Sequence, residues 1–224
     1  MAICTGRNRF ALRIGAWSLF WLVLVSGAVA ASGADATAKS AKSHRVAGAA
    51  GHWRLDPARS TLGFASVKNA TVGEGHQFTR LTGGISNAGV ARLGVDLASV
   101  DTGIEIRDQR MRELLFEVAR FAEARVQTQV SLPEVLKLAP GQTLLMPLEL
   151  QLAVHGGETT LGATVRVQRL SATRVLVSTV RPVVVNADAF GLAEGIERLR
   201  AIAGLQTISP VVPVSLVLEF RLER

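Results

Sequence analysis

Histidines are the first residues of this sequence whose type could do chemistry, because an imidazole can transfer protons or bind a metal ion. They are His44, His52, His76 and His155. No two have the spacing of a helical metal site, and no HExxH motif occurs. His76 follows Gly75 in a glycine-rich stretch. Two interpretations of His76 are open: it lies in a loop or at a rim, or it has a catalytic role beside a carboxylate.

A group of carboxylates could supply the acid and the base of a hydrolytic reaction. Arginines stand between these carboxylates at helical spacing, which is typical of ordinary ion pairs on a helix surface. We interpret Arg107 and Asp108 as residues that fix this helix to a strand, with contact to a ligand headgroup as the alternative. The carboxylates are Asp101, Glu105, Asp108 and Glu113.

The composition excludes several classes of protein. Hydrophobic residues make up 48% and charged residues 19% of the 224 residues, which excludes an intrinsically disordered chain. A single cysteine excludes a disulfide framework and a multi-cysteine zinc site. The chain has no G-x-S-x-G elbow, P-loop or dinucleotide-binding glycine motif. We therefore predict a folded domain with no catalytic residue and no metal site, and not an enzyme.

The first 30 residues have the layout of a cleaved secretory signal peptide. Arg7, Arg9 and Arg13 form a basic stretch, an apolar run follows over 14–25, and Ala28-Val29-Ala30 supplies the small residues that precede cleavage. We expect a periplasmic protein. The alternative is an uncleaved signal that anchors the chain in a membrane, because 14–31 is close to the lower length limit for a spanning helix.

Residues 31–51 are small and polar without an apolar period, which predicts a flexible linker before a domain at 52–224. Loss of the three signal-peptide arginines leaves 22 of the 25 basic residues against 18 acidic ones. The formal charge then falls from +7 to +4. A positive excess this small does not favour a nucleic-acid partner.

The domain alternates apolar and polar residues with a period of two, which predicts β-strands. About eight short strands separated by turn residues favour an all-β antiparallel sandwich or barrel. Two stretches with helical spacing, 104–120 and 193–203, predict two short helices, with Gly204 as a C-terminal cap of the second. The predicted strands are 53–56, 60–67, 78–86, 91–97, 146–154, 161–167, 174–185 and 214–222.

Five sequence blocks resemble the YceI-like family of periplasmic proteins. The most specific is SVDTGIEIRDQRMRELLFEVARF at 99–121. The others follow the family order and are WRLDPARSTLGF at 53–64, similar to the family's first hairpin, GHQFTRLTGGI at 75–85, LQLAVHGGETTL at 150–161 and NADAFGL at 186–192. The chain departs from the family pattern at Leu81, where a phenylalanine is usual, and at Asn186, where an arginine is common.

The resemblance implies an extended, lipocalin-like antiparallel β-barrel of about eight strands. It also implies periplasmic binding, sequestration or transport of a long isoprenoid or quinone-like lipid, with no catalysis and no cofactor besides that lipid. Expected partners are the amphiphilic lipid and, transiently, the inner membrane or a respiratory membrane protein. The resemblance also allows the protein to form a homodimer. The alternatives are a structural or stress-related interaction protein with a filled barrel, and an enzyme that acts on a lipid or quinone.

The apolar faces of the strands would line the lumen of such a barrel. We expect Met111, Leu115, Phe116 and Phe190 to close one end with the helices as a lid, and Trp53 to plug the barrel. The residues predicted to contact lipid are Leu62, Phe64, Phe78, Leu93, Val95, Leu97, Met111, Leu115, Phe116, Leu148, Leu150, Leu152, Val165, Val167, Phe190, Leu216 and Leu218.

Overall fold

The structure, a computed structural model, describes residues 52–223 and forms a closed antiparallel β-barrel. The barrel closes because the first and the last strand pair, with Trp53 opposite Leu222. The predicted signal peptide and linker lie outside the described residues. The eight barrel strands, in their order around the barrel, are β1 (His52–Leu55), β4 (Leu81–Ile85), β5 (Val90–Asp96), β7 (Glu123–Gln129), β8 (Thr143–Val154), β9 (Gly157–Ser171), β10 (Arg174–Thr179) and β12 (Val211–Glu223).

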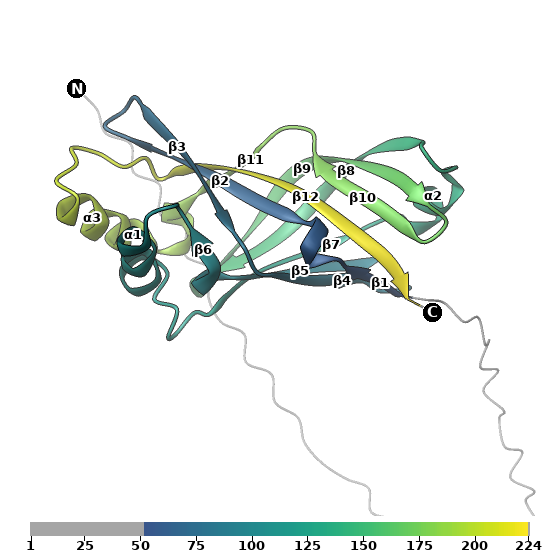
Figure 1. Cartoon of the computed structure of the whole chain (residues 1–224), viewed down its shortest axis with the longest axis horizontal. Coiled ribbons are helices and arrows are strands. Elements are labelled where there is room, and N and C mark those ends of the chain that lie inside the picture. The colour runs from purple at the N-terminus through teal and green to yellow at the C-terminus, as the bar shows by residue number, and fades with distance from the viewer. Residues whose placement is uncertain (1–51, 224) are drawn as a thin grey trace, which may run out of the picture. The chain divides into compact units, whose positions relative to one another are not determined.

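Strand β12 is long enough to pair with barrel strands at one end and with a second group of strands at the other. Its last residues pair with β1 and β10, and its first residues pair with β2 (Thr61–Lys68) and β11 (Val183–Asn186). Strand β2 continues into β3 (Val72–Phe78), which pairs with the two-residue β6 (Val100–Asp101). The β2–β3 hairpin therefore extends the wall of the barrel beyond β12 (Figure 1).

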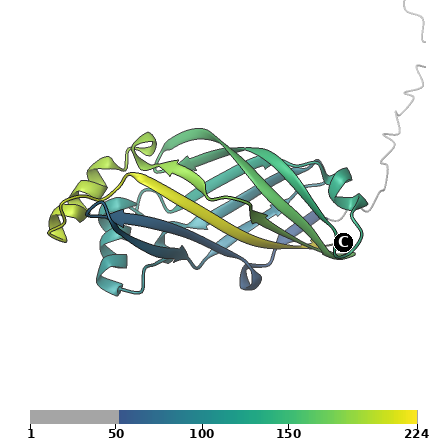
Figure 2. The ribbon, with the colours of Figure 1, turned by 90° about the horizontal axis from the view of Figure 1, so that it is seen from above.

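Helices lie at both ends of the barrel. Helix α1 (Glu105–Arg110), which continues into a π-helical turn at Met111–Leu115, and α3 (Ala193–Ile202) cover one end, and α2 (Leu132–Lys137) lies at the other (Figures 1 and 2). Short 3-10 turns at Pro57–Arg59, Leu97–Ser99 and Ala187–Phe190 complete the connections. Among residues 52–223, no helix is long and apolar enough to cross a membrane.

The predicted all-β fold with an eight-stranded antiparallel barrel is confirmed. The β8–β9 turn also follows the sequence signal, because His155 (φ 49°) and Gly156 (φ 80°) both adopt positive φ angles. Two consecutive positive φ angles match the twist of a hairpin, and glycine adopts them without strain. Gly204, with φ 62°, follows Ala203, the C-cap residue of α3, and so lies just past the end of the helix as predicted.

Other expectations about elements were wrong. The first two strands do not pair with each other as a hairpin, because both pair with β12 instead. The predicted strand 78–86 is broken at 79–80, and the predicted run 174–185 is broken at 180–182, where Pro182 removes a backbone donor. The sequence also did not predict β3, the two-residue β6, β7 or α2, and the described chain has three α-helices rather than two.

Candidate functional site

The part of the barrel next to α1 and α3 is hollow. It encloses a cavity of about 530 Å³, within the usual range for small-molecule sites. Side chains from α1, the π-helical turn and α3 line the cavity, whereas none from α2 does. The wall is mostly aliphatic and aromatic. Because such a wall offers few hydrogen bonds, it favours a long apolar ligand over a polar one.

Toward α2 the barrel is filled with side chains. Val165 of β9 lies on the cavity wall, while its partner Met146 on β8 is only 6% exposed and lies outside that wall. Trp53 is 2% exposed in this filled part, and the guanidinium carbon of Arg169 lies 5.3 Å from the centre of its indole ring. This position agrees with the predicted plug. The cavity therefore has a floor on the α2 side.

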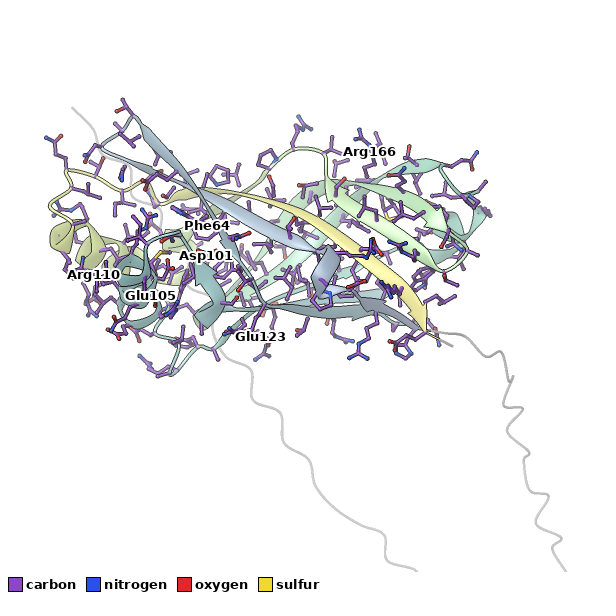
Figure 3. All side chains as sticks on the ribbon, in the orientation of Figure 1. Phe64, Asp101, Glu105, Arg110, Glu123 and Arg166 are labelled. Atoms are coloured by element: carbon purple, nitrogen blue, oxygen red, sulfur yellow. The ribbon has the colours of Figure 1, made fainter. Side chains whose placement is uncertain are left out.

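Most charged side chains of the wall gather where the β2–β3 hairpin meets α1. Glu74 accepts a hydrogen bond from Lys68 Nζ at 2.9 Å and one from Arg107 Nη1 at 2.8 Å. The hydrogen bond from Lys68, with a further contribution from Arg107, holds the pKa of Glu74 below its usual range. Figure 3 shows Arg110, another charged residue of the wall, at this same end. The cavity is thus polar at its helical end and apolar toward its floor.

His76 lies on the inner face of β3, in contact with this charged group. Its Nε2 atom lies 2.9 Å from the hydroxyl oxygen of Ser66, and its ring centre lies 5.2 Å from that of Phe64. The buried Nδ1 atom has no hydrogen-bond partner among the described residues. Burial, with the charge of Arg107, lowers the pKa of His76, which favours the neutral imidazole. A position of His76 in a loop was wrong, because β3 carries the side chain into the wall.

Arg107 and Asp108 position the helical end of the cavity. Arg107 reaches strand β3 through Glu74, as we interpreted from the sequence. Asp108, 4% exposed, instead accepts hydrogen bonds from the backbone N–H and the hydroxyl of Thr102, in the loop before α1. Buried carboxylates require such donors. The two residues together fix the start of α1 against the barrel.

The lid packs closely against the cavity. The ring of Phe116, directly after the π-helical turn, lies 5.8 Å from that of Phe78 on β3. Helix α3 crosses the π-helical turn at Gly195, where an added Cβ would lie 2.7 Å from the carbonyl oxygen of Leu114. The helices can approach this closely because Gly195 has no side chain. Leu115 from the same turn then faces the cavity.

One contact at the polar end of the cavity resembles part of a hydrolytic site. Ser66 and His76 form a serine–histidine contact, but no carboxylate of the described residues binds Nδ1 of His76 and orients the ring. No group of three or more metal-ligating side chains occurs within residues 52–223. What the wall offers is a large apolar surface with a few polar atoms at one end, the usual pattern of a site for an amphiphilic molecule.

The structure brings together nearly all of the residues predicted to contact lipid. Val167 is the exception, since it is 4% exposed in the filled part and does not line the cavity. That the others contact a lipid stays a prediction. Those on the cavity wall are Leu62, Phe64, Phe78, Leu93, Val95, Leu97, Met111, Leu115, Phe116, Leu148, Leu150, Leu152, Val165, Phe190, Leu216 and Leu218.

Sequence reasoning missed a second set of wall residues. Strand β7 contributes Ala124, Val126 and Thr128, and Val130 follows directly after the strand. Their period of two was visible, but polar residues with long side chains separate them. The polar group at the helical end was missed for another reason: polar residues on a strand usually face solvent. Its members on β2 and β3 are Ser66, Lys68, Glu74 and His76.

Comparisons with known proteins agree with this architecture. The family model of the YceI-like domain matches residues 53–220. A polyisoprenoid-binding domain from Saccharophagus degradans, implicated in plant cell wall breakdown, is 43% identical and has a TM-score of 0.75. The match covers 76% of this chain and 98% of that one.

A second solved structure, BcnA from Burkholderia cenocepacia, is 16% identical with a TM-score of 0.57. The match covers 74% of this chain and 98% of BcnA, and it shows the fold alone. No curated protein matches the chain.

Proposed function

Because this chain belongs to the YceI-like domain family, we propose that it binds and carries a long isoprenoid or quinone-like lipid inside its barrel. The observation that carries the proposal is the apolar cavity of about 530 Å³ within a closed barrel. Each buried CH₂ group of a ligand contributes ~0.8 kcal/mol of transfer free energy, so a long tail supplies affinity without polar contacts. The likeness to a polyisoprenoid-binding domain at 43% identity supports this ligand class.

In this proposal the polar end of the lipid lies at the helical end of the cavity. Ser66, His76 and Arg107 are on the wall there, and the other end is closed by apolar side chains. The unpartnered Nδ1 of His76 would gain a hydrogen-bond partner in a polar headgroup. The tail would then extend toward the floor, away from solvent.

The lipid is sequestered unchanged in this proposal, and the protein acts in the periplasm. The basic stretch, the apolar run and the Ala28-Val29-Ala30 sequence support export. The absence of an orienting carboxylate on His76, among the described residues, supports binding without chemistry. An enzyme that acts on the lipid is the competing function, and the same experiment tests it.

The test is native mass spectrometry of protein that is exported to a periplasm and purified without detergent. We expect a discrete adduct that is extractable into organic solvent and whose mass equals that of an unmodified isoprenoid lipid. A bare processed chain that takes up no polyprenol or ubiquinone on incubation would overturn the proposal. An extracted lipid that the purified protein converts into a species of different mass would favour an enzyme.

A matched pair of variants on β8 locates the lipid. Leu150 lines the cavity, whereas Leu145 is 55% exposed on the outer face of the same strand. Leu150→Trp fills part of the cavity, so the occupancy by lipid should fall severalfold. Leu145→Trp adds the same side chain outside the barrel, so its occupancy should equal that of the wild type. Equal occupancy of the two variants would place the lipid outside the cavity.

A further inference from the structure

The two ends of the cavity differ in polarity. This difference determines the orientation of a bound lipid, and the closed end limits the length of its tail. Charged and polar side chains lie at the helical end, around Glu74 and His76. The opposite end is closed by buried apolar side chains from β8, β9 and β10, which are Met146, Val167 and Val175. A lipid bound with its headgroup at the polar end therefore meets this floor with the last units of its tail.

Met146 is the buried residue of the floor that also borders a space outside the cavity. It pairs with Val165, which lines the cavity, but its own side chain borders a second hollow on the surface under α2. The turn at 87–89, residues 129–134 and residues 147–148 form the rest of that hollow. Val130 and Leu148 line both the cavity and the hollow. Val130, Met146 and Leu148 thus stand between the inner end of the cavity and the space under α2.

The chemistry of Met146 suits an adjustable barrier. A methionine is unbranched and has three rotatable side-chain bonds, so it fills irregular space and changes rotamer more easily than the β-branched residues beside it. Val167 and Val175, only 4% and 2% exposed, hold the rest of the floor in place. A branched residue at position 146 would close the floor more rigidly.

We propose that Met146 is the stop that determines the longest isoprenoid tail the barrel accepts. This inference rests on the proposed function and adds a selectivity for chain length to it. Truncation of Met146 joins the cavity to the hollow under α2, so a longer tail passes the floor. A bulky residue at Leu148, one inward-facing position closer to the helical end, raises the floor and excludes the longest tails that the wild type binds.

The test is a competition between polyprenols of increasing length, from geranylgeraniol to solanesol and longer chains, supplied together to delipidated protein. Native mass spectrometry identifies each bound polyprenol from the mass of its complex with the protein. Met146→Ala should raise the share of chains above the wild-type limit severalfold, and Leu148→Trp should remove the longest chains bound by the wild type. Leu145→Ala, which changes an exposed side chain on the same strand, should keep the wild-type distribution.

The outcomes separate this inference from the function on which it rests. A wild-type protein that binds none of the polyprenols and no ubiquinone contradicts the proposed function itself. If the wild type binds polyprenols and a folded Met146→Ala variant has the same length distribution, the role of Met146 is overturned and the proposed function stands, whatever Leu148→Trp does. If Met146→Ala fails to fold, the volume-conserving Met146→Leu decides instead: its branched side chain should lower the share of the longest chains bound, and an unchanged length distribution overturns the role of Met146.

Discussion

Arg107 donates a hydrogen bond from Nη1 to Oε2 of Glu74 over 2.8 Å, and this ion pair joins α1 to β3. Lys68 on β2 binds the other oxygen of the same carboxylate. The side chains of Arg107 and Glu74 are 27% and 31% exposed, so water screens the pair only in part. One carboxylate thus connects the lid to both strands of the hairpin at the polar end of the cavity.

Glu74→Gln should loosen this connection with little change in shape. Because the pair is partly exposed, we expect a loss of about 1 kcal/mol in the free energy of unfolding. The amides of α1 should also exchange faster with deuterium, which mass spectrometry can follow. Glu105→Gln on the same helix breaks a more exposed pair with Arg112 and should cost less than about 0.5 kcal/mol. Equal exchange of α1 in the two variants would contradict a specific role of Glu74.

His76 should make the stability of the protein depend on pH. Burial, and then the charge of Arg107, lowers its pKa in the folded state below the value of an exposed histidine. Between those two pKa values the unfolded chain binds a proton that the folded chain does not, so stability falls as the pH decreases through this interval. Above the ordinary histidine pKa the effect is absent.

His76→Gln removes this titration. Its free energy of unfolding, measured by urea titration between about pH 8 and pH 5, should fall less steeply with decreasing pH than that of the wild type. The difference should be largest below the ordinary histidine pKa. Identical slopes for the two proteins over this range would show that His76 is not the group responsible.

Phe116→Ala should affect both the fold and the bound lipid. The ring is 7% exposed, contacts Phe78 and also lines the cavity. A buried phenylalanine replaced by alanine costs about 3–5 kcal/mol, and we expect the lower part of this range because one face of the ring borders an existing cavity. Thermal unfolding of delipidated protein measures the stability alone, without the contribution of a ligand. A loss below about 1 kcal/mol there would mean that the ring serves the ligand only.

The fold was predictable where a strand has one apolar and one polar face. The alternation around Leu148 and Leu150 gave the inner face of β8 correctly, since the period of a strand is independent of its neighbours. Which strands are hydrogen-bonded neighbours was not predictable from the alternation. That β1 pairs with β12 rather than β2 depends on closure of the barrel, which brings together residues from the two ends of the domain.

The floor of the cavity shows the same limit of sequence reasoning. Val165 and Val167 are chemically identical and point the same way, yet one lines the cavity and the other packs into the filled part. Across the β8–β9 pair, Val165 lies opposite Met146, whereas Val167 lies opposite Leu144, one step further into the filled part. A period of two identifies the inner face of a strand but carries no information about how deep the space along it extends.

Gly195→Ala should separate the two helices of the lid. A Cβ atom at this position would lie 2.7 Å from the carbonyl oxygen of Leu114 and 2.8 Å from the Cα atom of Leu115. Both are backbone atoms that no rotamer change can move. The higher helix propensity of alanine, about 1 kcal/mol, offsets part of the strain. We expect a net loss of about 1–2 kcal/mol in the free energy of unfolding.

The matched control for this variant is Gly162→Ala on β9, where an added Cβ meets no atom within 4 Å. Its stability should stay within about 0.5 kcal/mol of the wild type. Because Leu115 lines the cavity, Gly195→Ala should also release a fluorescent polyprenol faster in a stopped-flow displacement assay, whereas Gly162→Ala should not. Equal release rates for the two variants would mean that the lipid leaves by a route that does not require movement of α3 against the π-helical turn.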